Sequence, residues 1–417
     1  MLHDLKREWW FFCRDRQAVA TIVTAAILAV GVVWLGLADV AAQRDEIAFL
    51  SATTQSELET ALAHQGDAGS AAYYGFRMAL APPNELTFAA RGVREELPWK
   101  HRLRILALEG QIYESDAGNP ELEQTGRIDF AFLISVLAPL LVILLLHDVV
   151  DGERRHKRLD LLTATAGVAS SWASRRVLIR TAMLSLALVL PLMFAALLTG
   201  AAPDDVIQLS LISAAYVTAW GYVVLFVAHR IESAATVATT LLCIWVTLTL
   251  LIPLGGATYA ERQYPVPEGG QILLQQRETV NDAWDLPHTQ TMNAFAASHP
   301  EWQAHTKLDD GFDWKWYYAF QQLGDESVAD LSRELRDGVR ARDQVMAKVA
   351  WLSPPLFVER RFSRLARTDI TAFQNYESCA RDYHAYLRHA QYPMLFGVEQ
   401  FDLDKLLALE SVRYCKT

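Results

Sequence analysis

The chain has 417 residues, of which 52% are hydrophobic and only 21% are charged, and its formal net charge is −10. Runs of about 18 residues without Lys, Arg, Asp or Glu are long enough to cross a bilayer, so they exclude an ordinary soluble enzyme. Such runs cover residues 18–38, 130–147, 181–203, 206–228 and 233–260. The acidic balance, without clustered basic and aromatic residues, argues against a nucleic-acid partner.

Residues 1–17 are predicted to form a helix at the cytoplasmic membrane surface. Leu2, Leu5, Trp9 and Phe12 recur every three or four residues, which places them on one helical face. Basic residues beside an aromatic face are typical of helices that lie in the membrane interface. A basic tail that frays in water is the alternative.

Residues 18–40 are predicted to be the first transmembrane helix. Small residues such as Ala38, Ala41 and Ala42 follow the apolar run, so a cleaved signal peptide is the alternative. A retained helix is favoured because the run exceeds the roughly 7–15 residues of a signal h-region.

Residues 41–129 are predicted to form a first extracytoplasmic domain. A helix is expected over residues 43–64, ended by the glycines of the segment 66–69. Alternation of polar and apolar residues at Arg102–Ile105, followed by apolar Leu106–Leu108, favours a strand over residues 102–108. So short an alternation also leaves a helix open.

The membrane part is predicted to continue with a second transmembrane helix at 130–146, a cytoplasmic segment at 147–176 and three transmembrane helices within 177–253. Lys and Arg gather before the first span and after the second, which places both segments in the cytoplasm. These residues are Lys6, Arg7, Arg14, Arg16, Arg154, Arg155, Lys157, Arg158, Arg175, Arg176 and Arg180.

Residues 254–417 are predicted to form a second, mainly helical extracytoplasmic domain with a core of its own. One long amphipathic helix is expected over residues 324–352, stopped by Pro354 and Pro355, and another helix over 369–390. Residues 386–417 hold only a short apolar patch, so no sixth span is expected there and the C-terminus should be extracytoplasmic.

The four cysteines divide by compartment. Cys13 is expected to be cytoplasmic, and Cys243 lies within the fifth apolar run. Cys379 and Cys415 share the second extracytoplasmic region, where a disulfide between them would close a loop of about 37 residues and stabilise the fold by roughly 3–4 kcal/mol. Two free thiols are the alternative.

Catalytic and metal-binding motifs are missing or weak. The sequence has no GxxxxGK[ST], GxSxG or HExxH motif, so this chain is not expected to hydrolyse ATP or to be an enzyme. Imidazoles and carboxylates that can bind a metal occur close together at His299, Glu301, His305, Asp309 and Asp310. The pattern favours a helix start at Pro300 instead, because a metal site needs several ligands that converge in space. No metal site is therefore expected.

Aromatic residues are dense between positions 314 and 320, where Trp314, Trp316, Tyr317, Tyr318 and Phe320 occur. Such a cluster can stack on a ligand. Packing in a core or in a membrane-interface belt is the more common use and is favoured here.

The segment after the second span is the most informative one. It contains the acidic–basic pair Glu153–Arg154, the short apolar stretch Leu159–Leu162 and the later pair Arg175–Arg176. In these features it resembles the permeases of type-2 ABC transporters, in which an "ER" pair and a short Leu-containing helix follow the second membrane helix. The chain departs from many members at Lys157–Arg158, where they have Gly-Thr.

The resemblance extends along residues 1 to about 390. The segment 119–126, Asp129, Phe132, the segment 139–141, the run 245–253 and the loop 264–267 resemble a subgroup whose large outer domains have no assigned function. The family normally has six membrane helices, and this sequence departs from that number.

The resemblance implies a mainly α polytopic protein of the bacterial cytoplasmic membrane. The apolar runs of this sequence give it about five transmembrane helices and two extracytoplasmic insertions. The resemblance also implies a non-catalytic permease subunit that binds no cofactor itself, while ATP and Mg²⁺ bind to a partner ABC ATPase. A second permease, identical or homologous, and the lipid bilayer complete the expected partners. Export of an unidentified substrate is the expected direction.

The residues implied in ATPase coupling are Glu153, Arg154, Leu159, Leu161 and Leu162. The alternative for this loop is a solvated basic face that only enforces topology. The alternative for the whole chain is a non-transporting module that passes the ATPase stroke to an extracytoplasmic protein for assembly or signalling.

Overall fold

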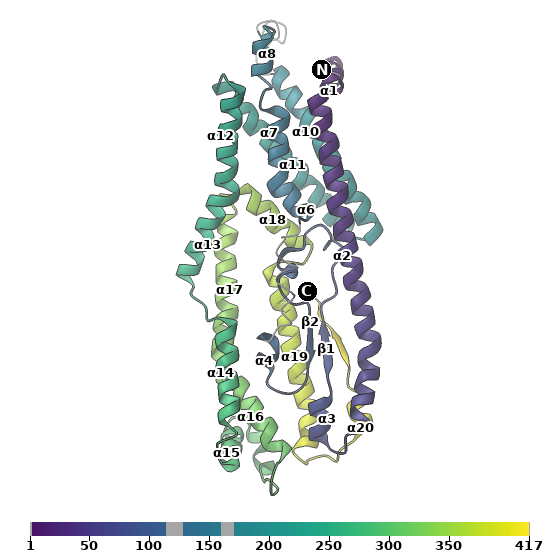
Figure 1. The fold of residues 1–417 in the computed structure, drawn as a ribbon, viewed down its shortest axis with the longest axis vertical. Helices are drawn as coiled ribbons and strands as arrows, with labels where there is room; N and C mark the ends of the chain where they lie inside the picture. The colour runs from purple at the N-terminus through teal and green to yellow at the C-terminus, as the bar shows by residue number, and fades with distance from the viewer. Residues whose placement is uncertain (1, 114–127, 160–170, 417) are drawn as a thin grey trace.

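The computed structural model describes residues 2–113, 128–159 and 171–416. The molecule is elongated, with a helical bundle at one end and a larger mixed region at the other (Figure 1). Within the described residues, five helices are long and apolar enough to cross a membrane: Arg16–Leu62, Phe130–Arg155, Trp172–Thr199, Pro203–Arg230 and Ala234–Gln263. The protein is thus mainly helical and polytopic in character, as the sequence predicts.

The chain begins with α1 (Leu2–Arg14) and, after a turn at Asp15, enters α2 (Arg16–Leu62). The Asp15 carboxylate caps α2 by accepting hydrogen bonds from the backbone N–H groups of Gln17 and Ala18. α2 is one uninterrupted helix of 47 residues. The separate predictions for residues 18–40 and 43–64 therefore describe two halves of the same helix.

The second span contains a π-helical turn. It consists of α6 (Phe130–Phe132), the turn η2 (Leu133–Leu137) and α7 (Ala138–Leu146). Two backbone carbonyls of η2 accept hydrogen bonds from neighbouring spans: Ser135 from the Tyr216 hydroxyl at 2.8 Å and Val136 from the Trp245 indole at 3.0 Å. A π-helical turn interrupts the regular hydrogen bonds of the helix backbone, and these two bonds satisfy backbone carbonyls there in an apolar environment.

The remaining spans are α10 (Ser171–Thr199), α11 (Pro203–Arg230) and a helix built from α12 (Ala234–Val246), η3 (Thr247–Leu251) and α13 (Ile252–Gln263). The predicted boundary between residues 253 and 254 is wrong, because the fifth helix continues to Gln263. Pro253 stands in the first turn of α13, directly after the π-helical turn η3, where its missing N–H is tolerated.

A small sheet lies in the larger region, with strand order β2-β1-β3. β1 (Arg77–Leu80) pairs antiparallel with β2 (Lys100–Leu103) and parallel with β3 (Val412–Tyr414). The strand predicted over residues 102–108 is thus shorter and begins earlier. β2 ends at Leu103 because the next residue, Arg104, forms hydrogen bonds with the Gln111 side chain through both its backbone N–H and its C=O.

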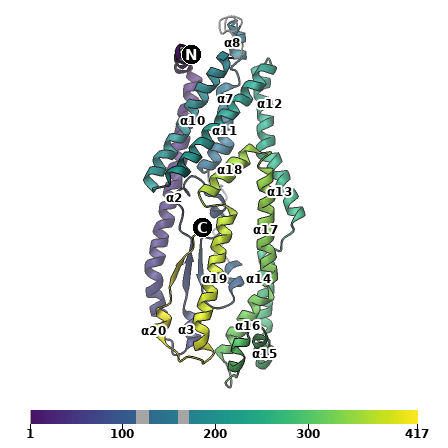
Figure 2. The same ribbon diagram turned by 180° about the vertical axis from the view of Figure 1, so that it is seen from behind.

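Helices α2 and α19 (Ile370–Leu395) flank this sheet (Figures 1 and 2). The other helices of the larger region are α3 (Ala68–Tyr74), η1 (Gly92–Glu95), α4 (Leu108–Tyr113), α14 (Gly269–Asp282), α15 (His288–Ser298), η4 (Pro300–His305), α16 (Trp314–Ser327), α17 (Ala329–Val349), α18 (Pro354–Leu365) and α20 (Leu403–Leu407).

The single helix predicted over residues 324–352 is wrong. α16 ends at Ser327 and α17 begins at Ala329, with fully buried Val328 at the break. The Ser327 hydroxyl donates to the Gly324 carbonyl, so a side chain competes for the last turn of α16. The predicted helix over 369–390 corresponds to α19, whose first turn is capped by Asp369.

The two polar regions share one core instead of building one each. Ala72, Leu103 and Ile112 from the first region are buried in the same cluster as Phe295, Trp316 and Tyr376 from the second. A disulfide between Cys379 and Cys415, with Cα atoms 5.8 Å apart, joins α19 to the residue after β3. We call this unit, formed by residues 68–113 and 264–416 with the second half of α2, the distal domain.

Helix α2 belongs to both the bundle and the distal domain. Its first half is buried against the bundle through residues such as Ala25 and Val33, whereas Leu58 and Leu62 are buried with Met394 and Leu406 of the distal domain. At Gly36 the backbone of Phe88 comes so close that a Cβ atom would lie 2.2 Å from its carbonyl oxygen. α2 is therefore packed along most of its length.

Candidate functional site

The end of the bundle farthest from the distal domain brings together α1, α8 (Asp151–Arg155) and the beginnings of α10 and α12 (Figure 1). We call it the basic end, because the clustered Lys and Arg residues of the sequence lie in these elements. The residues implied in ATPase coupling lie on and after α8. The geometry of this end decides what they can contact.

Glu153 is buried at the basic end and bonded within the chain. Its carboxylate accepts from the Arg176 guanidinium at 2.7 Å and lies 2.9 Å from Nε of Arg158. The same Arg176 also contacts Glu8 of α1 at 3.1 Å. One arginine of α10 therefore links α1 to α8.

Arg176 is held in place by packing as well as by charge. Its guanidinium carbon lies 5.1 Å from the centroid of the Trp172 ring, one turn earlier on α10. Trp172 itself is fully buried in the bundle core. A guanidinium fixed between an aromatic ring and two carboxylates retains little rotational freedom, so its geometry is well defined.

A second arginine repeats this arrangement one turn further along α10. Arg180 donates to the Asp15 carboxylate at 2.6 Å and to the Leu145 carbonyl at 2.7 Å. Asp15 is the cap of α2, and Leu145 lies in the last turn of α7. Arg180 thus ties the start of the long helix α2 to the second span.

Arg154 contacts a different part of the bundle from the one that Glu153 contacts. Its guanidinium donates to the Glu232 carbonyl at 3.1 Å, in the turn before α12. Asp151 accepts from the backbone N–H of Ala234 at 3.2 Å, in the first turn of α12. α8 is consequently bonded to α10 on one side and to the start of the fifth span on the other.

The remaining predicted coupling residues are placed only in part. Leu159 is partly buried and packs against the bundle core. Leu161 and Leu162 lie outside the described residues. Glu8 and Asp15, which complete the ion pairs, were not singled out from the sequence. Their arginine partners on α10 are 168 and 165 residues away, and no local spacing connects residues so far apart.

The distal domain contains a broad cleft of about 1580 Å³, bordered by α2, β2, α17 and α19. Apolar and charged side chains alternate along it, among them Leu50, Trp99, Arg102, Leu335 and Phe373. The Arg102 guanidinium lies over the Phe76 ring, 3.7 Å from its centroid. The cleft is open and mixed in chemistry, so its lining does not define one class of small ligand.

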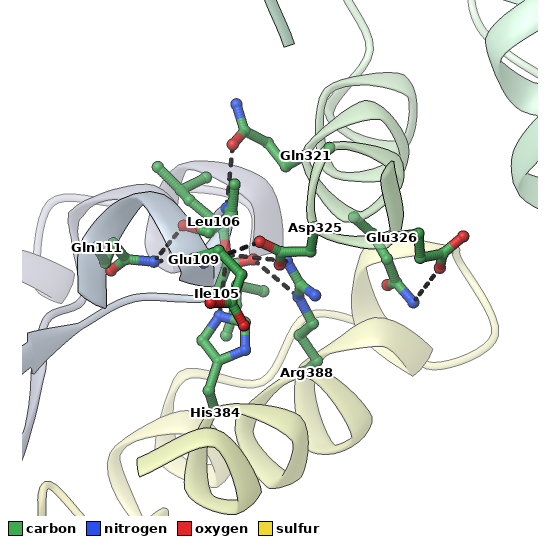
Figure 3. Close-up of polar contacts among 12 residues, drawn as sticks. Ile105, Leu106, Glu109, Gln111, Gln321, Asp325, Glu326, His384 and Arg388 are labelled. Carbon is green, nitrogen blue, oxygen red and sulfur yellow. Dashed lines mark hydrogen bonds and ion pairs between the residues drawn. The ribbon is translucent and has the colours of Figure 1, made fainter. Parts of the chain in front are cut away.

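A second polar cluster lies inside the distal domain, where Figure 3 shows side chains of α16 and α19 directed at the turn that follows β2. Gln321 accepts from the Ala107 N–H and Asp325 from the Glu109 N–H, each at 3.0 Å. Arg388 donates to Asp325 at 2.7 Å and to the Leu106 carbonyl at 2.9 Å. The cluster satisfies backbone groups that β2 leaves free.

His384 completes this cluster as a neutral side chain. Its Nε2 lies 2.9 Å from the Leu106 carbonyl and 3.1 Å from the Arg104 carbonyl, so the proton sits on Nε2. Complete burial lowers the pKa of His384 well below its usual value, and the nearby positive charge of Arg388 adds to this effect. Its geometry supports a turn and presents no base to a reacting group.

Of the residues considered for a metal site, His299 lies 3.5 Å from Glu301 and has closer partners outside the set. His299 contacts the Glu326 carboxylate at 2.5 Å and Gln322 at 2.6 Å. In the part of the chain that the structure describes, no group of three His, Cys, Asp or Glu side chains is arranged to hold a metal ion. Among the aromatic residues, Trp316, Tyr318 and Phe320 are buried in the distal core, where packing accounts for them.

Comparison with known protein families gives one match. Residues 271–414 are similar to a domain of unknown function (DUF3526), a segment that covers less than half of the chain. It runs from α14 to β3 and lacks β1, β2, α3 and α4, which complete the same core. Comparisons with curated proteins and with solved structures give no match.

Proposed function

We propose that this chain is the permease subunit of an ATP-driven ABC-type transporter in a bacterial cytoplasmic membrane. The basic end would face the cytoplasm and bind a separate ATPase, which holds ATP and Mg²⁺. The distal domain would be extracytoplasmic, and a second permease, identical or homologous, would complete the pore. Export of an unidentified substrate fits this arrangement. The chain itself would carry no catalytic residue.

The observation that carries the proposal is the continuity of α2. A helix of 47 residues is about 70 Å long at 1.5 Å per residue. Its first turn is held at the basic end by the Asp15–Arg180 ion pair, and Leu58 and Leu62 are buried in the distal domain. A displacement of the basic end by an ATPase would therefore be transmitted along one rigid element.

The contact with the ATPase would involve the exposed charges of the basic end, since Glu153 is already bonded within the chain. The Arg155 side chain is 63% exposed, and Lys157 is exposed as well. These cations fit an acidic groove on the partner, which would set the orientation and the rate of association. Glu153 would then hold α8 against α10 and would not touch the ATPase itself.

A direct test replaces both exposed cations, in Arg155→Glu/Lys157→Glu, and measures copurification of the ATPase and its stimulated turnover. Both should fall at least tenfold, whereas thermal unfolding of the purified chain should stay unchanged because neither side chain is buried. Arg333→Glu is the matched control, since Arg333 is also 63% exposed but lies on α17 in the distal domain. Unchanged copurification and turnover in the double variant would contradict the proposal.

A second candidate is a non-transporting module that passes the same stroke to an extracytoplasmic protein. The cleft of about 1580 Å³ in the distal domain, bordered by α2 itself, favours it, because motion of α2 would alter the cleft directly. Flux into vesicles that contain the reconstituted complex separates the two candidates. ATP-dependent flux supports transport, and normal ATP turnover without any flux supports the module.

A further inference from the structure

The junction between α17 and α18 exposes two large apolar side chains. Trp351 is 79% exposed and Leu352 is 68% exposed, although both follow a helix whose surface is otherwise highly charged. Contiguous exposed apolar patches, unlike single exposed apolar residues, mark surfaces that contact a protein or a membrane. The question is which partner covers them.

The tip lies directly beside the fifth span. The Ser353 hydroxyl donates to the Leu248 carbonyl in η3 at 2.7 Å, and Gly256 of α13 packs against Val349 of α17. Leu250, Leu251 and Leu254 on the same stretch of the span are also exposed. The tip therefore adjoins the apolar, uncovered surface of a helix that can cross the membrane.

The depth of the tip follows from the bundle. Asp15 and Asp39 mark the polar limits of the first span. The 24 residue steps from one to the other correspond to about 36 Å of helix, close to the thickness of a bilayer core with its interface. The Arg91 guanidinium forms an ion pair with Asp39 at 2.7 Å, and the Arg91 backbone N–H donates to the Asp129 carboxylate at 2.9 Å. Asp39, Arg91 and Asp129 therefore mark the boundary of the hydrocarbon core on the side of the distal domain.

On the fifth span the same boundary falls near Pro253, because about 20 residues of helix from Ser233 cross the hydrocarbon core. Leu248 and Gly256, which contact the tip, lie on either side of Pro253. Trp351 and Leu352 are thus at the level where the hydrocarbon core meets the headgroups. Tryptophan is enriched at this level, because one side of its ring is apolar and the other can bond to water.

Helix α18 continues from the tip across the end of the bundle, between the spans and the rest of the distal domain (Figures 1 and 2). Its own side chains Val358 and Phe362 are buried against the bundle core, and the Phe362 ring lies 6.0 Å from that of Phe130. Arg364 in the last turn of α18 and Arg367 just after the helix are exposed. An amphipathic helix at this level has the character of an interfacial element.

We propose that Trp351 and Leu352 insert into the membrane interface on the distal side and bind lipid there. The distal domain would then be attached to the bilayer at α2, at α13 and at this tip. Because α17 is a rigid rod ending at the tip, the anchor would fix the distance between the wall of the cleft and the membrane surface. The inference depends on membrane insertion only and not on the partner ATPase.

The test uses a fluorophore at position 352 in the full chain. Leu352→Cys is made in a Cys13→Ser/Cys243→Ala background, labelled with an environment-sensitive dye and reconstituted in phosphatidylcholine nanodiscs. Spin-labelled lipid should quench it several-fold more strongly than the same dye at Leu274→Cys, which is 69% exposed on α14. Leu197→Cys, at the distal end of α10 and 81% exposed, serves as the lipid-facing reference.

Quenching at position 352 equal to that at position 274 would overturn the proposal. A second copy of the chain could also cover the tip, and oxidation would then cross-link Leu352→Cys between chains while lipid quenching stays low. That outcome too would overturn it. Trp351→Cys, labelled in the same way, checks the result at the neighbouring position, and an unfolding transition matching that of the parent shows that each labelled chain is folded.

Discussion

Two arginine networks in this protein use the same chemistry for different purposes. At the basic end, Arg176 and Arg180 lie near the start of α10 and join it to α1, to α8 and to the cap of α2. In the distal domain, Arg388 and Asp325 lie inside a continuous core and hold a single turn against α16 and α19. The first network can change when a partner pulls on α1 or α8, whereas the second can change only if the domain unfolds.

The distal network should therefore give the largest effect on stability. Asp325→Ala leaves Arg388 buried without its carboxylate and leaves the Glu109 N–H without an acceptor. Removing one partner of a buried ion pair costs about 3–5 kcal/mol. Thermal unfolding in detergent measures this loss. Asp330→Ala is the control, since its exposed pair with Arg333 should contribute about 1 kcal/mol or less. Equal stability of both variants would show that the cluster is not structural.

The two networks also show where sequence reasoning succeeds and where it does not. The spans were predicted because each is a local run of apolar residues, and their ends follow charges such as Asp39 and Asp129. β1 and β3 were missed because Met78 pairs with Val412, and nothing in either short segment indicates the other. The distal domain was divided in two for the same reason, since its core depends on contacts between distant residues.

Local competition explains the remaining errors. The pattern of apolar residues continues through Val328, but the Ser327 hydroxyl and the close packing of Gly324 against Val280 end α16 there. The basic end is a separate case, where Glu153 and Arg154 are predicted to take part together in ATPase coupling, and that role stays a prediction. The structure gives them different partners, because adjacent residues on a helix point about 100° apart.

A pH effect sharpens the comparison, because the distal domain buries histidines in neutral form. Burial, with a further contribution from the charge of Arg381, lowers the pKa of His101 from 6.5 to about 4. The unfolded chain therefore binds a proton that the folded chain does not, so the stabilisation is present above pH 6.5 and is lost as the pH falls toward 4. At about 1.4 kcal/mol per pKa unit, this loss reaches about 3 kcal/mol.

The substitution His101→Phe tests this effect, because a Phe ring can keep the stacking on Tyr376 that His101 makes. Chemical unfolding measured at pH 7 and at pH 4.5 should show a smaller difference for the variant than for the parent chain. Part of the difference should remain, since the pKa of buried His384 is also lowered. An identical pH dependence in both chains would show that His101 is protonated without cost.

The smallest effect distinguishes two neighbouring residues of the basic end. Glu153→Ala removes an acceptor from Arg176 and Arg158, and because Arg176 keeps Glu8 the cost should be about 2 kcal/mol, below that of a fully isolated buried charge. Arg154→Ala removes one hydrogen bond to the Glu232 carbonyl, which contributes about 1 kcal/mol or less. Thermal unfolding should rank the two variants in this order. Trypsin should cleave near Arg155 and Arg158 faster in Glu153→Ala than in Arg154→Ala, because loss of the Glu153 carboxylate detaches α8 from Arg176 and removes the partner of Arg158. If instead both variants keep the stability of the parent chain and both lose the ATPase, Glu153 contacts the partner directly, and the ion pair with Arg176 must open when the complex forms.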